Sequence, residues 1–267
     1  AENVFYQLSE CGELSLAAML SAYAELHEGE KALLLYNYVR DNKHVPLSDT
    51  AFISILKACS QEGSLELCKY LHFPIIFACF NPNLVLLEST LICAYRGCAS
   101  IIDAEAVFDG LQNPDIVAWN ACIDGYGGQG NSLSSLGTID KLQQEGVNPN
   151  KATFTSALSA FSHGGLVNQG VQCIITMKQQ YGVNPDLKHY SSMIDLLGRA
   201  GDFKRLISLL THIQLFGYVK ADATLWLCVL GACRIHGNHE LGNLAFNNAL
   251  KLQPNDPAAY ILMSNLV

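Results

Sequence analysis

Four twelve-residue stretches of this chain superpose without gaps, and they constrain its fold more than any other feature. They are WNACIDGYGGQG (119–130), FTSALSAFSHGG (154–165), YSSMIDLLGRAG (190–201) and WLCVLGACRIHG (226–237). Each stretch has large or apolar residues at its first, fourth, fifth and eighth positions, which is the spacing of one face of an α-helix. The same template finds copies that begin at Leu16 and Phe52, and a weaker copy that begins at Glu88.

A second amphipathic segment follows each of these stretches and ends at a helix-breaking motif. The motifs are CFNPN (79–83), EGVNPN (145–150) and YGVNPD (181–186). A Gly near a helix C-terminus with a Pro shortly after it is a stop signal. The chain is therefore predicted to consist of helix pairs. A single pair cannot bury its apolar face, so neighbouring pairs must stack into an all-α solenoid with a continuous core.

The helix pairs predict repeat units with defined boundaries. The units are 13–48, 49–84, 85–115, 116–150, 151–186, 187–222 and 223–256. The first eight residues, AENVFYQL, return almost unchanged as AEAVFDGL at 104–111, where they form the second helix of the unit 85–115. Residues 1–12 are therefore interpreted as the end of a unit whose first helix is missing.

Composition excludes several classes of protein. With 267 residues, 50% of them apolar and 15% charged, the chain can bury a large core. Its ten cysteines are irregularly spaced without a CxxC pair, so we expect buried free thiols and no disulfide framework or metal site. The sequence shows neither a membrane-spanning run nor a secretory signal, so we expect a soluble chain without membrane association.

Several of these units resemble plant pentatricopeptide repeat proteins in sequence and in order. The resemblance rests on VAWNACIDGY, TFTSALSAFSHGGLVNQG, HYSSMIDLLGRAG and LWLCVLGACRIHGNHELG. It points to the subclass built from triplets of standard, long and short repeats with C-terminal extension motifs. The triplets would be 13–115 and 116–222, followed by an extension motif at 223–256 and the truncated start of a second at 257–267.

The resemblance implies a fold, a function and a location. The fold would be a right-handed superhelical solenoid of antiparallel helix-turn-helix repeats. Such proteins bind single-stranded RNA in chloroplasts or mitochondria and mark particular cytidines for conversion to uridine. About one base per repeat would be recognised, with the RNA running 5′ to 3′ from the N- to the C-terminal units.

Base recognition is expected at the fifth and last residues of each unit. The second and fifth residues leave the same face of the first helix, and the last residue lies in the turn before the next first helix. Two polar side chains can then meet the edge of one base. The expected pairs are Ser89 with Asp115, Asn120 with Asn150, Thr155 with Asp186, and Ser191 with Asp222. Leu86, Val117 and Lys188, each the second residue of a unit, are expected to clamp the bases.

The resemblance also suggests which bases are preferred. Ser89 with Asp115 and Ser191 with Asp222 would favour guanine, and Asn120 with Asn150 a pyrimidine, whereas long repeats such as 151–186 read weakly. In the first triplet, Ala17 with Ser48 and Ile53 with Leu84 lack the usual hydrogen-bonding groups. Specificity is therefore expected mainly from residues 85–222. The formal net charge of −8 gives no broad attraction to phosphate, so we expect modest affinity.

Two further hypotheses concern catalysis and partners. The zinc deaminase domain of many relatives needs an HxE motif and a downstream CxxC, and this chain contains neither. We therefore expect no enzyme activity and no cofactor. A deaminase would come from another protein or a missing segment, and docking of editing factors is expected at 223–267, whose stretch 239–256 resembles a tetratricopeptide helix. The rival hypothesis is a protein-binding, tetratricopeptide-like scaffold without an RNA role.

Overall fold

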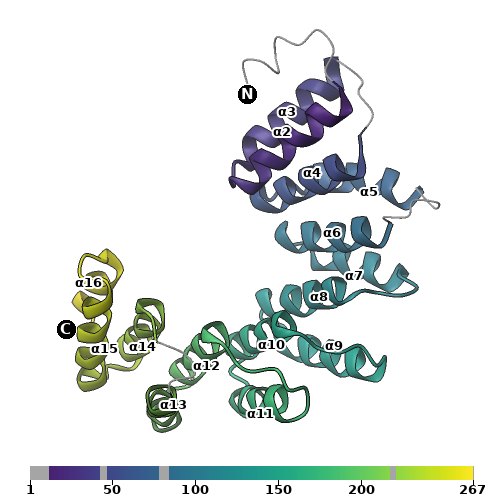
Figure 1. The fold of residues 1–267 in the computed structure, drawn as a ribbon. Coiled ribbons are helices and arrows are strands. Elements are labelled where there is room, and N and C mark those ends of the chain that lie inside the picture. Colours follow the sequence, from purple (N-terminus) through teal and green to yellow (C-terminus); the bar gives the residue numbers. More distant parts are fainter. Residues whose placement is uncertain (1–11, 43–46, 78–83, 217–220, 267) are drawn as a thin grey trace. The chain divides into compact units, whose positions relative to one another are not determined.

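The chain is helical throughout the part that its structure describes. The computed structural model describes residues 12–42, 47–77, 84–216 and 221–266. Over these ranges it has fifteen α-helices and no strand (Figure 1), which confirms the all-α prediction. None of the described helices combines the length and apolarity that a membrane span requires. The prediction for AENVFYQL lies outside the described residues.

The helices alternate between two sets. The first helices of successive pairs are α2 (Glu13–Glu25), α4 (Asp49–Glu62), α6 (Leu84–Gly97), α8 (Ile116–Gly128), α10 (Lys151–Gly164), α12 (Leu187–Arg199), α14 (Ala223–His236) and α16 (Pro257–Ser264). The second helices are α3 (Gly29–Asn42), α5 (Leu65–Phe77), α7 (Ile101–Gly110), α9 (Ser132–Gln144), α11 (Val167–Gln179), α13 (Phe203–Phe216) and α15 (His239–Leu252). Each first helix begins at the first residue of a predicted unit, except that α6 begins one residue early.

The chain divides into two compact units, residues 1–125 and 126–267, and the division falls within α8. Inside the first unit, α2 contacts α4, and α4 contacts α6. Inside the second unit, α10, α12, α14 and α16 contact one another in the same successive way. First helices therefore stack on first helices within each unit, while second helices such as α13 and α15 pack against their own partners.

The aromatic residues that open the four repeated stretches lie in the core, as their position on the apolar face predicts. Trp119, Phe154, Tyr190 and Trp226 are all buried. In the second unit the core runs continuously from α10 to α16, so no helix pair there buries its apolar face alone.

Glycines allow the first helices to approach closely and to end sharply. A Cβ at Gly198 of α12 would lie 2.3 Å from the Cβ of Ala232 in α14, so a larger residue would push these helices apart. Gly165 follows α10 with a φ of +66°, a left-handed conformation that side chains rarely adopt. The chain can therefore turn tightly into α11.

Candidate nucleic-acid interface

The last residue of most units caps the first helix of the next one, whereas Leu84 lies inside α6. Asp115 Oδ1 accepts a hydrogen bond from the backbone N–H of Ala118 at 2.9 Å, and Asp222 Oδ1 accepts one from the N–H of Leu225 at 2.8 Å. Asn150 and Asp186 cap α10 and α12 in the same way. A helix start leaves N–H groups without partners, and Asn or Asp satisfies them. These four side chains are therefore held in fixed places on successive first helices.

Ser89 and Asp115, which the sequence paired across 26 residues, are in direct contact. The Ser89 hydroxyl donates to Asp115 Oδ1 at 2.8 Å. Ser89 is completely buried, however, with 0% of its surface exposed. Its hydroxyl is enclosed and points to the carboxylate, so Ser89 orients Asp115. The expected contact of Ser89 with a base stays a prediction.

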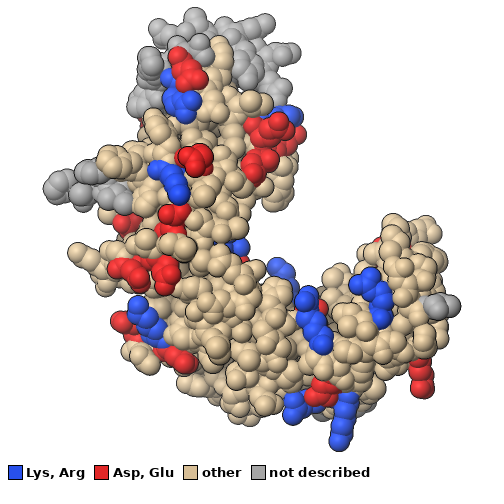
Figure 2. All heavy atoms as spheres, turned by 180° about the vertical axis from the view of Figure 1, so that it is seen from behind, with Lys and Arg blue, Asp and Glu red and all other residues tan. Residues whose placement is uncertain are grey.

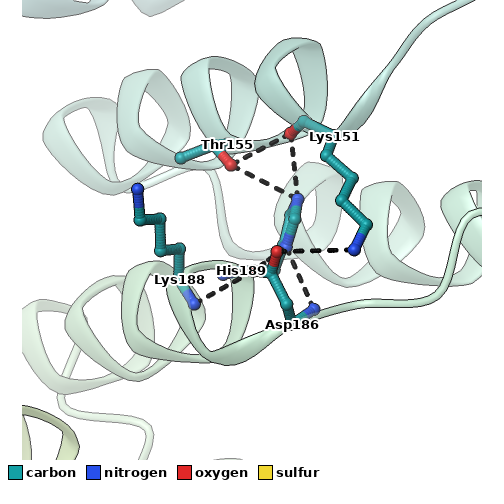
Figure 3. Close-up of polar contacts among 5 residues, drawn as sticks. All are labelled: Lys151, Thr155, Asp186, Lys188 and His189. Carbon is teal, nitrogen blue, oxygen red and sulfur yellow. Dashed lines mark hydrogen bonds and ion pairs between the residues drawn. The ribbon is translucent and has the colours of Figure 1, made fainter.

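Thr155 and Asp186 are also joined, through a third residue that the sequence analysis did not assign to the site (Figure 3). The Nδ1 atom of His189 lies 2.6 Å from Asp186 Oδ1, and its Nε2 atom lies 3.3 Å from Thr155 Oγ1. The same Nε2 is 3.0 Å from the carbonyl oxygen of Lys151. One imidazole ring thus bridges both members of the expected pair.

The ring of His189 completes the cap of α12 and is completely buried. The sequence signal is the spacing of Asp186 and His189, which places them at the N-cap and at the third helical residue, where a capping box forms. The contact with Thr155 depends on how α10 and α12 pack, so the sequence gives no sign of it.

One lysine lies near the Asp186 carboxylate, and a second lysine is exposed in the first turn of α12. The Nζ atom of Lys151 lies 3.8 Å from Asp186 Oδ2, and the side chain of Lys188 is exposed. Burial raises the pKa of Asp186, but the interactions with His189 and Lys151 outweigh it, so the pKa lies below its usual value. Asp186 is therefore ionised at neutral pH.

The remaining expected site residues occupy first helices as well. Leu86 on α6 and Val117 on α8 are exposed over 51% and 46% of their surfaces, so both are available to a ligand. Asn120 lies half-buried in α8 within the compact unit 1–125, whereas Asn150 belongs to the compact unit 126–267. Ser191 is half-buried on α12. The pairing of Asn120 with Asn150, and of Ser191 with Asp222, stays a prediction.

Charge is unevenly divided between the two units. Residues 1–125 hold 16 acidic and 6 basic residues, a formal net charge of −10, whereas residues 126–267 hold 8 acidic and 10 basic residues, a net charge of +2. Figure 2 shows acidic and basic side chains scattered among uncharged side chains on one face. Although the total charge is −8, residues 126–267 carry a small positive net charge and do not repel phosphate.

Stacked helix pairs, most of them joined at a polar residue that caps the next first helix, define the class of protein as an α-helical repeat protein. Family models place it further. Residues 114–163 match the PPR repeat family and residues 188–218 match the PPR repeat. The chain belongs to the family of pentatricopeptide repeat (PPR) proteins.

Curated relatives from Arabidopsis thaliana share this assignment. Pentatricopeptide repeat-containing protein At4g16470 is 36% identical over 248 residues, which cover 93% of this chain and 48% of the relative. The chloroplastic protein At1g08070 and the mitochondrial protein At3g26782 are each 31% identical, over 97% and 100% of this chain and over 36% and 40% of their own lengths. The chain thus spans at most about half the length of these relatives.

A solved structure shows the same fold. The crystal structure of PPR10 in complex with an 18-nt psaJ RNA element aligns with a TM-score of 0.64 at 16% identity, and covers 99% of this chain and 44% of PPR10. The predicted fold class, a solenoid of helix pairs, is therefore confirmed.

Proposed function

We propose that this chain binds single-stranded RNA in a sequence-specific manner, with about one base for each helix pair. The observation that carries the proposal is the contact between Ser89 and Asp115, 2.8 Å apart although 26 residues separate them in the chain. The fifth residue of a unit and its last residue thus meet at one junction between first helices. Junctions of this kind along residues 85–222 would supply one polar position per unit, as repeat-wise recognition of RNA requires.

The chemistry at the first junction favours guanine. Both hydrogen bonds from Ser89 and Ala118 reach Oδ1 of Asp115, so we assign Oδ2 to the ligand. A carboxylate oxygen accepts from the N1–H or the exocyclic amino group on the Watson–Crick edge of guanine. Leu86 and Val117, which are exposed on the helices either side of this junction, would hold the base between them. Asp222 and Ser191 would recognise a second guanine in the same way.

The second unit supports binding electrostatically. Its net charge of +2 contrasts with the −10 of residues 1–125, and it carries the expected positions from Asn150 to Asp222. Lys188 is exposed and can pair with a phosphate. RNA contacts are therefore assigned to residues 85–222, with most of the favourable charge in the C-terminal part.

For the whole protein we propose the role of specificity factor in organellar C-to-U RNA editing, in a plastid or mitochondrion. The relatives named chloroplastic and mitochondrial support an organellar location. The deaminase would be supplied by another protein or by a further segment of the chain, and residues 223–267 would contact it or other editing factors. The standard, long and short classes of the repeats belong to the same proposal.

The test is a binding experiment with a panel of single-stranded RNAs. Oligonucleotides that carry the order guanine, pyrimidine, any base, guanine are compared with oligonucleotides in which each defined base is replaced in turn. Each replacement should weaken binding by about three- to tenfold, because it removes a polar contact. Equal binding of all the RNAs, or no binding, would favour the rival role of a protein-binding scaffold, for which the acidic first unit would be the surface to examine.

A further inference from the structure

We propose that His189 keeps the polar groups of Thr155 and Asp186 hydrogen-bonded within the protein, so that the repeat 151–186 contacts the RNA backbone without selecting a base. This inference rests on the proposed function and identifies a residue that determines where along the RNA specificity is lost. The loss of base selection is attributed to the buried side chain of His189 and not to Thr155 and Asp186 themselves.

Both polar groups that would face the base already take part in intramolecular hydrogen bonds (Figure 3). Oδ1 of Asp186 accepts from the backbone N–H groups of Lys188 and His189 and lies 2.6 Å from the ring Nδ1. The Thr155 hydroxyl donates to the Lys151 carbonyl at 3.0 Å and is 3.3 Å from the ring Nε2. A base would have to break these bonds before it could form its own, and the exchange leaves little net gain.

The other carboxylate oxygen has a cation nearby, at a distance longer than a hydrogen bond. Oδ2 of Asp186 faces the ammonium group of Lys151 at 3.8 Å. At the Ser89 junction, by comparison, Asp115 is bonded by one hydroxyl and one backbone N–H, and both bonds use the same oxygen. The Asp186 carboxylate therefore has less capacity left for a ligand than the carboxylate of Asp115.

The neighbouring unit shows that the cap itself does not require a histidine. Thr153 stands in α10 at the position that His189 takes in α12, and its hydroxyl completes the capping box by accepting from the backbone N–H of Asn150 at 3.1 Å. The short threonine bonds its own N-cap residue, whereas the ring of His189 continues to Thr155 on the preceding first helix. The link between the two helices is a consequence of the longer side chain.

The exposed lysines of these helices favour contact with the RNA backbone. Lys151 on α10 and Lys188 on α12 are exposed, and ammonium groups bind phosphate regardless of the base attached to it. The unit would add affinity and maintain the spacing between the bases on either side. The carboxylate of Asp186 is the acidic group that faces the ring at 2.6 Å, and Lys151 is the cation nearest to that carboxylate.

The test varies only the base opposite this unit, the third base in the order guanine, pyrimidine, any base, guanine. Binding of the full chain to the four RNAs is compared for the wild type and for His189→Thr, which keeps the capping position but cannot reach Thr155. The wild type should bind all four within about twofold, and His189→Thr should prefer guanine by about fivefold, the value of one additional hydrogen bond. The double variant His189→Thr with Thr155→Val should lose that preference again.

Matched controls keep the inference testable if His189→Thr folds poorly. In the wild-type background, Thr155→Val should leave the flat response to the third base unchanged, whereas Ser191→Ala should weaken the guanine preference at the fourth. A wild type that selects the third base as strongly as the others, or a folded His189→Thr without new preference, would overturn the inference while the function stands. Loss of selection at every base would overturn the proposed function and this inference together.

Discussion

The hydrogen bond between Ser89 and Asp115 leads to a prediction about stability that is independent of RNA. Ser89→Ala removes a buried, charge-assisted bond of 2.8 Å and should cost about 1.5 kcal/mol. Asp115→Ala removes the cap of α8, worth about 1 kcal/mol. It also leaves the enclosed Ser89 hydroxyl without its acceptor, which costs about 2 kcal/mol more. The two single variants therefore sum to about 4.5 kcal/mol.

The double variant should be much less damaging than this sum. Once both partners are alanine no buried polar group is stranded, so the loss should be about 2 kcal/mol: about 1 for the missing cap and about 1 for the lost hydrogen bond. The expected coupling between the two sites is therefore about 2.5 kcal/mol. Additive losses would show that the Ser89 hydroxyl does not depend on Asp115, and the assignment of Ser89 as a positioning residue would be wrong.

Tryptophan fluorescence provides a local readout for this cycle. The chain has two tryptophans, and Trp119 is buried in α8, the helix that Asp115 caps. In a Trp226→Phe background, urea unfolding followed at Trp119 reports on this junction rather than on the second unit. A repeat protein need not unfold in a single step, so a probe near the altered site is preferable to a global signal.

Three further predictions concern packing, salt and pH. Gly198→Ala should destabilise the second unit by about 1–3 kcal/mol because its Cβ would meet Ala232, whereas Gly137→Ala, with nothing within 4 Å, should stabilise α9 by up to about 1 kcal/mol in thermal unfolding. Lys188→Ala should reduce the slope of log binding constant against log salt by about 0.7, and an unchanged slope would exclude a phosphate contact. Asp186 has a lowered pKa when folded, so its stabilising contribution is present above its unfolded pKa of about 3.9 and is lost as the pH falls through the folded value. Asp186→Asn should lack this part of the acid sensitivity in pH-dependent melting, and an identical acid profile would contradict the assignment.

The periodic part of the fold follows from the sequence. Phe154 and Trp226 are buried because apolar residues recur at helical spacing, and this local pattern needs no knowledge of the neighbours. The starts of α10 and α12 are equally local, because Asn150 and Asp186 are good caps after a helix-breaking Pro. The positions of the expected recognition residues along the chain depend only on these starts.

The sequence does not predict which of the recognition residues are already hydrogen-bonded within the protein. Ser89 is enclosed because of how α6 packs against its neighbours, and His189 reaches Thr155 only because α10 and α12 lie side by side. Both are contacts between helices more than 20 residues apart, which residue types and spacing do not reveal. The charge difference between residues 1–125 and 126–267 was present in the sequence but disappears when the charge is summed over the whole chain.

The central claim is that the last residue of a unit selects the base at that junction, and a substitution at Asn150 tests it most directly. Aspartate caps a helix as well as asparagine does, and the Thr153 N–H that bonds Asn150 at 3.0 Å can bond its replacement, so Asn150→Asp should leave α10 intact. Binding to RNAs that differ only at the pyrimidine is then measured for both proteins. The preference should move toward uracil in the variant, whereas an unchanged order of affinities in a folded protein would contradict the register on which the account depends.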